Sequence, residues 1–286
     1  RTIRRLQPQA VIAVMGPDVR WVGTESGYGR DTEWSVVPAS ESSLKQIAVS
    51  SQQEKGNGMF IPQGDAMEKD LGSREKLDKA KGVIWYPSEV DVSIRPGWYY
   101  HASQDSLVKT PQKLIDIFYS SVGKNSLLLL NLPPDKRGLI HENDVKALLD
   151  MQRILKETFQ YNLIENTTCT VSKKLITDLN PETDISMLEE DAVLMFSFDK
   201  EQLFNRFVVQ ENVTKGQRVE LFCLEYKKNN EWLVASQGTT IGYKRILRFP
   251  AVKAKEIRLV IQKSRDIPHI AEVGLYWASK EEGLSG

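Results

Sequence analysis

Cysteine and histidine, the residues that build disulfide frameworks and most zinc sites, are scarce in this sequence. Its 286 residues include two cysteines, Cys169 and Cys223, and three histidines, His101, His141 and His269. Two cysteines allow one bridge at most, and the histidines are too scattered for a zinc cluster. A phosphate-binding glycine loop and a nucleophile elbow are also missing. We therefore expect neither a metal nor an organic cofactor.

An excess of charge of either sign is missing as well. Lys plus Arg and Asp plus Glu each number 38, which gives a formal net charge of zero. Such a chain has no overall field to attract nucleic acid or an anionic membrane, and we expect neither partner. No segment approaches the roughly 20 apolar residues of a membrane span. Hydrophobic residues make up 41% of the chain, including six Trp, nine Tyr and nine Phe, which is enough for a sizeable core.

The first residues lack an initiator methionine and the pattern of a signal sequence. The chain opens at Arg1, and the segment "RTIRRLQPQ" has the character of the end of a helix. We therefore expect the chain to be the carboxy-terminal part of a longer protein.

Strand and helix patterns alternate over the first half of the chain. The runs 10–15, 82–94 and 126–134 predict strands, and the last is apolar enough to be buried on both faces. Residues 110–123 and 141–159 have helical spacing of apolar residues, the first with a threonine cap and a proline in its first turn. This alternation favours a parallel sheet and, at this length, part of a (β/α)8-type barrel. Because such a barrel needs about 250 residues, we expect its amino-terminal strands to come from elsewhere.

Short alternating segments separated by polar turns replace this pattern in the second half. They are residues 192–198, 205–211, 217–227, 231–242, 244–250, 256–263 and 270–277. Their spacing predicts an antiparallel β-sandwich of the jelly-roll, galactose-binding-like kind. The predicted fold class is therefore α/β plus all-β. We place the boundary near Tyr161 to Asn166, so that residues 1–160 form the carboxy-terminal part of the barrel and residues 161–286 form the sandwich.

Acids, cations and aromatic rings gather after the first two predicted strands. The side chains of interest are Arg20, Trp21 and Glu25 in "RWVGTESGYGRDTEW", and Glu89, Arg95 and Trp98 in "WYPSEVDVSIRPGWYYH". A sugar pocket needs a flat ring for the apolar face of the sugar and a few placed polar groups for its hydroxyls. The first cluster also has a structural interpretation, a polar loop pinned by an ordinary Arg–Glu pair, and in the second each residue taken singly has an ordinary structural role, such as a packed or capping histidine. Two such clusters after successive strands favour a carbohydrate site.

Three longer motifs resemble the α-L-fucosidases of glycoside hydrolase family 29, especially the branch acting on α-1,3/1,4-linked fucose. They are "LQPQAVI…GPDVRWVGTESG…DTEWS", "SEVDVSIRPGWYYH" and "SVGKNSLLLLNLPPDKRGLIHENDV". The resemblance runs from residue 1 to about residue 155, and the later sandwich is similar to the β-domain that follows the barrel in those enzymes. It implies release of terminal α-L-fucose from a fucosylated oligosaccharide or glycan, by a retaining mechanism with a covalent fucosyl-enzyme intermediate.

The resemblance also implies roles for single residues. The acid/base glutamate of that branch follows an Arg-Trp-Val-Gly motif and falls on Glu25, although Thr24 stands before it where Asn is usual. Glu89 is the competitor for this role, because it too is expected to end a barrel strand. Residues expected to bind substrate are Arg20, Trp21, Glu89, Arg95 and Trp98. The family's nucleophile lies in a Trp-Phe-Asp-Gly stretch that this sequence does not contain, so we expect the chain alone to be inactive.

Several alternatives stay open at this point. A non-catalytic carbohydrate-binding protein on the same scaffold is the main alternative to an enzyme, and a glycosidase for another hexose is a weaker one. The sandwich either supports the barrel or contacts sugar through Tyr226, Trp232 and Tyr243. From the resemblance alone, we expect a periplasmic or secreted protein.

Overall fold

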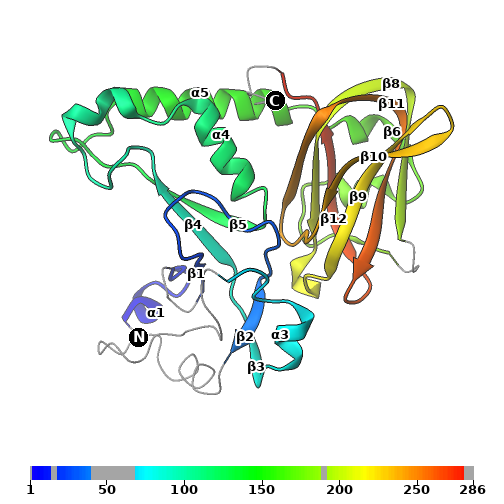
Figure 1. Cartoon of the computed structure of the whole chain (residues 1–286), viewed down its shortest axis with the longest axis horizontal. Coiled ribbons are helices and arrows are strands. Elements are labelled where there is room, and N and C mark those ends of the chain that lie inside the picture. The colour runs from blue at the N-terminus through cyan, green and yellow to red at the C-terminus, as the bar shows by residue number, and fades with distance from the viewer. Residues whose placement is uncertain (1, 14–17, 40–67, 188–191, 280–286) are drawn as a thin grey trace.

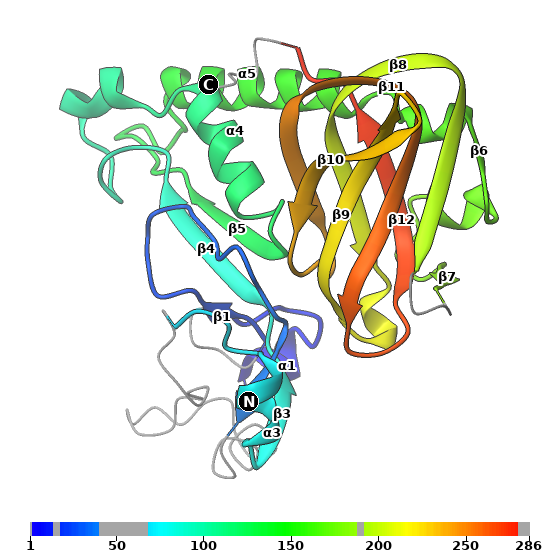
Figure 2. The same cartoon turned by 45° about the vertical axis from the view of Figure 1, so that its right-hand side comes forward.

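The computed structural model describes residues 2–13, 18–39, 68–187 and 192–279. Parallel strands with two covering helices form one part, and antiparallel strands form the other (Figures 1 and 2). Among the helices of these residues, none has the length and apolar character needed to cross a membrane.

The parallel sheet contains β1 (Arg20–Trp21), β4 (Ser88–Ser93) and β5 (Ser126–Asn131) in the order β1-β4-β5. Trp21 lies opposite Glu89, and Glu89 lies opposite Leu127. The prediction of parallel strands in this half is therefore confirmed for residues within 82–94 and 126–134. That the three strands belong to an eight-stranded barrel stays a prediction.

Helices α4 (Pro111–Ser120) and α5 (Glu142–Phe159) confirm the two helical patterns. Thr110 caps α4 by accepting a hydrogen bond from the Lys113 amide, and Pro111 occupies the first turn, where no amide partner is needed. The His141 side chain caps α5. The helices pack against each other and against one face of β5, where Leu130 joins the apolar cluster of Leu114 and Ala147.

The other face of β5 corrects the expectation of a strand buried on both sides. Leu127 is 50% exposed and Leu129 is 48% exposed. Because side chains alternate along a strand, these two leucines point away from the helices, on the same face as Glu89 and Asp91 of the neighbouring strand.

Residues 10–13 do not form the expected strand, and residues 14 and 15 lie outside the described part of the chain. The Ile12 amide donates to Asp18 Oδ2 at 2.7 Å, and its carbonyl accepts from the Asp18 amide at 3.2 Å. The polar groups of this backbone are thus used in a local turn. The short helix α1 (Thr2–Leu6) precedes it, in keeping with the helical character expected of the first residues.

The expected strand 82–94 is two strands in different sheets. β3 (Gly82–Trp85) pairs antiparallel with β2 (Val36–Ala39), whereas β4 belongs to the parallel sheet. Pro87, which has no amide hydrogen, separates them, and its carbonyl accepts a hydrogen bond from the Arg20 amide at 3.0 Å. The helix α3 (Arg74–Asp78) lies beside this small sheet.

The second part is one antiparallel sheet in the order β10-β9-β11-β8-β12-β7, with β6 paired to β8. Its strands are β6 (Thr167–Cys169), β7 (Ile185–Ser186), β8 (Val193–Glu211), β9 (Val219–Lys228), β10 (Glu231–Gly238), β11 (Arg245–Ser264) and β12 (His269–Tyr276). Four short 3-10 helices complete the described elements. The first part contains η1 (Ala102–Leu107), after β4, and the later residues contain η2 (Leu163–Asn166), η3 (Lys173–Ile176) and η4 (Val213–Lys215). The antiparallel pairing is confirmed, and the jelly-roll description and the boundary at 160/161 stay predictions.

Two pairs of expected strands are continuous in the structure. Segments 192–198 and 205–211 lie in β8, except for residue 192, and segments 244–250 and 256–263 lie in β11, except for residue 244. The register between the two strands shifts at Arg248/Val252 and Ala254/Glu256. The interruptions in the sequence pattern therefore mark irregularities inside long strands, which surround a single apolar core that includes Phe196, Phe207 and Phe222.

The two parts are joined by backbone pairing at the turn that follows α4. The Asn125 amide donates to the Lys244 carbonyl at 2.9 Å, and the Ile246 amide donates to the Gly123 carbonyl at 2.9 Å. Gly242 has a φ of +66°, and a Cβ atom there would meet the Asn125 side chain at 2.3 Å. A glycine is needed at this position, because the second part approaches the first so closely.

Candidate active site

The two predicted clusters meet at Glu25 and Trp98. The indole Nε1 of Trp98 donates to Glu25 Oε2 at 2.8 Å. Glu25 lies in the loop after β1, and Trp98 lies in the loop after β4. Both loops leave the carboxyl ends of neighbouring parallel strands, which is where barrel enzymes place their catalytic groups. The Glu25 side chain is exposed, so this carboxylate is accessible to a ligand.

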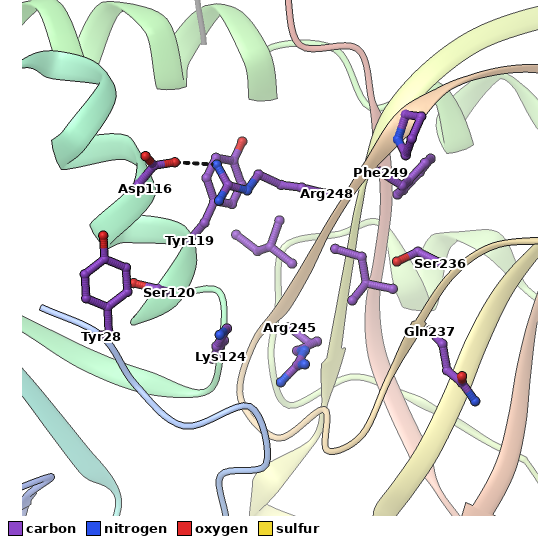
Figure 3. A pocket seen from close by; sticks show the side chains of 13 residues that line it. Tyr28, Asp116, Tyr119, Ser120, Lys124, Ser236, Gln237, Arg245, Arg248 and Phe249 are labelled. Atoms are coloured by element: carbon purple, nitrogen blue, oxygen red, sulfur yellow. Dashed lines mark hydrogen bonds and ion pairs between the residues drawn. The ribbon is translucent and has the colours of Figure 1, made fainter. Parts of the chain in front are cut away.

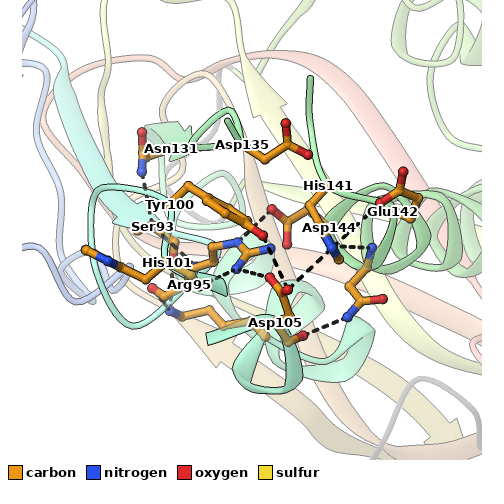
Figure 4. Close-up of polar contacts among 12 residues, drawn as sticks. Ser93, Arg95, Tyr100, His101, Asp105, Asn131, Asp135, His141, Glu142 and Asp144 are labelled. Atoms are coloured by element: carbon orange, nitrogen blue, oxygen red, sulfur yellow. Dashed lines mark hydrogen bonds and ion pairs between the residues drawn. The ribbon is translucent and has the colours of Figure 1, made fainter. Parts of the chain in front are cut away.

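Arg95 lies in a buried ionic network and does not contact Glu25 (Figure 4). Its Nε is 2.9 Å from Asp144 Oδ2 on α5, and its Nη1 is 2.9 Å from Asp105 Oδ1 in η1. The Tyr100 ring covers the guanidinium at 4.8 Å, and His141 Nε2 lies 3.4 Å from Asp105. Arg95 thus anchors the loop that carries Trp98, and its expected contact with substrate stays a prediction.

Asn131, at the end of β5, holds the backbone of the same loop. Its Nδ2 donates to the Trp98 carbonyl and to Ser93 Oγ, each at 3.0 Å. The Ser93 hydroxyl in turn donates to the Gly97 carbonyl at 2.7 Å. The Trp98 ring is therefore positioned by contacts from two strands as well as by its bond to Glu25.

Trp21, Glu89 and Asp91 share one face of the parallel sheet. The Trp21 indole donates to Asp91 Oδ1 at 2.7 Å. Glu89 is only 4% exposed, and its Oε1 has no hydrogen-bond partner among the described residues. Burial, with a smaller contribution from the negative charge of Asp91, raises the pKa of Glu89.

Glu89 does not end its strand, in contrast to the expectation that made it a competitor of Glu25. It is the second residue of β4, near the amino end of the strand. Because β3 ends at Trp85 and β4 begins at Ser88, Glu89 lies near the start of a new strand. Four residues of β4 follow Glu89 before the loop that carries Trp98 begins, whereas β1 ends at Trp21, directly opposite Glu89.

Arg20 lies on the opposite face of β1 and is only 1% exposed. It forms an ion pair with Glu33, and its Nε donates to the Tyr86 carbonyl at 3.1 Å. Burial is the main cause that lowers the pKa of Arg20, to about 9. This arrangement is the one described by the structural alternative, an Arg–Glu pair that pins a loop. That Arg20 binds substrate stays a prediction.

The loop segment around Glu33 is held by the antiparallel part of the molecule, which the sequence did not predict. Gln217 Nε2 donates to the Glu33 carbonyl at 2.8 Å, and Gln217 Oε1 accepts from the Ser35 amide at 2.8 Å. The Thr240 hydroxyl accepts from the Glu33 amide at 3.1 Å. The loop that begins with Glu25 is therefore fixed at its far end by side chains almost two hundred residues away.

Candidate sugar contacts in the antiparallel part have local partners. The Trp232 ring is covered by Arg258 at 4.3 Å and by Lys227 at 5.8 Å, whereas Tyr243 is 52% exposed. Both cysteines are free. In residues 2–13, 18–39, 68–187 and 192–279, no group of three or more His, Cys, Asp or Glu side chains is arranged to hold a metal.

A family model described as Alpha-L-fucosidase matches residues 10–158, which is just over half of the chain. The chain belongs to the alpha-L-fucosidase family. Alpha-L-fucosidase 1 of Arabidopsis thaliana is 35% identical over 96% of this chain, but the match covers only 53% of that relative. The chain thus spans about half the length of the plant relatives it matches, a rice protein included.

Solved structures of this family are similar over nearly the whole chain. A Bacteroides ovatus ATCC 8483 structure assigned to the alpha-L-fucosidases is 42% identical with a TM-score of 0.77, covering 97% of this chain and 44% of that one. A Ruminococcus gnavus GH29 fucosidase in complex with fucose is 25% identical with a TM-score of 0.73, covering 93% of this chain and 52% of that one. The similarity includes the antiparallel part, because the matches extend well beyond residue 158.

Proposed function

We propose that this chain supplies the acid/base half of an α-L-fucosidase active site, which releases terminal α-1,3/1,4-linked fucose with retention of configuration. The observation that carries the proposal is the Glu25–Trp98 pair at the carboxyl ends of β1 and β4. It joins an accessible carboxylate to a flat aromatic ring, the two groups that protonation of a glycosidic oxygen and binding of a sugar face require.

In this mechanism an aspartate attacks the anomeric carbon while the Glu25 carboxyl group donates its proton to the glycosidic oxygen. The bond between the anomeric carbon and that oxygen breaks, and a covalent fucosyl-enzyme forms. The Glu25 carboxylate then takes a proton from water, whose oxygen attacks the anomeric carbon and releases the aspartate and fucose. The two carboxyl groups of such a retaining pair lie about 5–5.5 Å apart.

The aspartate comes from outside this chain in our proposal, because the 286 residues contain no Trp-Phe-Asp-Gly stretch. The half-exposed Leu127 and Leu129, beside Glu89 and Asp91, support this. That face has the mixed apolar and acidic character of a barrel interior, and further strands would cover it. The chain alone is then inactive.

The remaining predicted site residues divide into two groups in this proposal. Trp21, Glu89 and Trp98 lie on the ligand side, where Trp98 contacts the sugar and the other two form the floor of the pocket. Arg20 and Arg95 hold loops through their buried ion pairs and do not touch substrate.

The test compares three proteins in release of 4-nitrophenol from 4-nitrophenyl α-L-fucoside and of fucose from a Lewis-type trisaccharide. They are this chain, a fusion that places the amino-terminal portion of the Bacteroides ovatus relative ahead of Thr2, and the Glu25→Gln form of that fusion. Of the three proteins, we expect only the unmodified fusion to be fully active. This chain should be inactive, and the Glu25→Gln fusion should cleave the trisaccharide at least a hundredfold more slowly than the unmodified fusion.

Glu89→Gln in the same fusion is the matched control for the acid/base role. We expect it to keep more activity than Glu25→Gln, because its carboxyl is buried whereas the Glu25 carboxylate is exposed to a ligand. If Glu89→Gln loses more activity than Glu25→Gln, the acid/base role belongs to Glu89. A fusion that folds but cleaves no fucoside, while other nitrophenyl glycosides are hydrolysed, would point to another sugar.

A non-catalytic carbohydrate-binding protein on the same scaffold is the second candidate, and the accessible Glu25–Trp98 pair would serve it equally well as a sugar contact. Fucose binding by this chain without turnover in any fusion would establish it. For either function we propose an exported protein, since enzymes that harvest glycans act outside the cytoplasm. Detection only in the cytoplasmic fraction of the source cells would contradict this.

A further inference from the structure

A groove of about 880 Å³ lies between α4 and the start of β11, outside the site described above. Its volume falls within the range of roughly 300–1,000 Å³ typical of small-molecule sites. Figure 3 shows Tyr28, Asp116 and Lys124 on one side and Ser236, Gln237 and Arg245 on the other. The two walls thus come from the two parts of the molecule.

Positive charge dominates the lining of this groove. Lys124, Arg245 and Arg248 line it, with Asp116 as the acid among the lining residues. Arg248 is paired with Asp116 at 2.7 Å, and Lys124 is paired with Asp31 at 2.5 Å. Of the three cations that line the groove, Arg245 is therefore the one whose positive charge is not neutralised by an ion pair among the described residues.

Arg245 is a buried cation without a carboxylate partner. It is only 7% exposed, and among the described residues it forms no ion pair. Its Nη1 donates to the Asp31 backbone carbonyl at 2.6 Å, whereas its Nε has no partner in the described part of the chain. Burial lowers the pKa of Arg245, with a smaller opposing effect from the negative charge of Asp31, which is bound to Lys124 and 85% exposed. A buried charge of this kind is stabilised by an anion.

Tyr28 connects the groove with the candidate active site. It lines the groove and also a cavity of about 400 Å³ that reaches Thr24, the residue before Glu25. The Tyr28 ring is 41% exposed, and its hydroxyl is held by Lys113. Because three residues span at most about 11 Å, Tyr28 and its end of the groove lie within reach of a short oligosaccharide whose fucose is at Glu25.

We propose that this groove binds the acidic group of a substituted saccharide, a carboxylated or sulfated sugar of the glycan from which fucose is released. That the ligand is a saccharide rests on the proposed function, whereas its negative charge is inferred from the buried Arg245. In this arrangement the guanidinium of Arg245 donates to the anionic group, Lys124 adds long-range attraction, and Tyr28 covers a face of the sugar.

Isothermal titration of this chain at low ionic strength tests the proposal, with galactose 6-sulfate, galactose and inorganic sulfate as probes. Galactose 6-sulfate should bind at least about tenfold more tightly than galactose or sulfate, as expected for a charge-assisted hydrogen bond added to sugar contacts. Arg245→Met should abolish this difference, and Arg153→Met, on the exposed surface of α5, should leave it unchanged.

Equal binding of galactose and its sulfate would overturn the acidic part of the proposal. Inorganic sulfate as tight as the sugar sulfate would overturn the saccharide part. If Arg245→Met does not fold, Ser236→Trp decides instead, because it fills the groove without removing a cation, and unchanged binding in that variant would refute the site. Binding needs no turnover. The absence of binding by a fusion that still releases fucose therefore refutes this inference alone, and binding by a folded fusion that releases no fucose refutes the proposed function alone.

Discussion

At the scale of single residues, Trp98 joins two loops that are 73 residues apart in the sequence. Trp98→Phe keeps an aromatic face and removes the indole N–H that positions the Glu25 carboxylate. We expect kcat of the fusion to fall about tenfold with little change in KM, because one charge-assisted hydrogen bond is lost while stacking remains. Trp98→Ala, the matched control, should also raise KM. Unchanged kcat in Trp98→Phe would mean that the bond has no positioning role.

Two buried glutamates make stability depend on pH. Burial is the main cause that raises the pKa of Glu211 and of Glu272 from 4.5 to about 7. Between these values the folded protein holds protons that the unfolded chain has released, so the free energy of unfolding falls as pH rises from about 5 to 7 and levels off above. Thermal melts between pH 5 and 8 should follow this course.

Glu272→Gln isolates one of these two groups. The Leu179 amide donates to the Glu272 carboxylate, and a glutamine oxygen can accept the same bond. The variant should therefore melt with a shallower pH dependence than the parent and gain most at pH 7 to 8. An identical slope in the two proteins would show that Glu272 ionises normally.

At the scale of elements, α5 anchors the loop after β4 through one buried ion pair. Both side chains of the Arg95–Asp144 pair are 0% exposed. Asp144→Asn leaves the guanidinium without this charge partner and should lower the free energy of unfolding by about 3–5 kcal/mol in urea titration. Lys146→Ala breaks an exposed pair on the same helix and should cost only about 0.3–0.5 kcal/mol. Similar losses in the two variants would contradict a buried anchor.

The helix α5 shows which features of the structure local sequence patterns can predict and which they cannot. The apolar spacing and the caps of α4 and α5 depend on neighbouring residues, so both helices could be predicted. The sequence placed Glu25 and Trp98 in clusters after successive strands, but it did not predict the hydrogen bond between them. The partners of Arg95 could not be predicted, because Asp144 lies 49 residues away and no local pattern marks it. Pro87 does mark the break between β3 and β4, and it was the signal that would have corrected the position of Glu89.

At the scale of the whole molecule, the antiparallel part acts as a support for the active-site loop. Gln217, only 7% exposed, bonds both the Glu33 carbonyl and the Ser35 amide. Gln217→Ala leaves the buried Ser35 amide without this acceptor and should lower stability by about 1–3 kcal/mol. Because the same loop carries Glu25, kcat of the fusion should fall as well, at temperatures where the protein is fully folded.

Gln262→Ala is the control for that variant, since Gln262 is an exposed glutamine bonded to Gln237 on the surface. It should change neither the melting temperature nor kcat. A Gln217→Ala protein that is destabilised but has normal kcat would show that the antiparallel part only stabilises the fold. A fall in kcat that exceeds any loss of folded protein would instead make Gln217 a positioning residue for Glu25, acting across the boundary between the two parts.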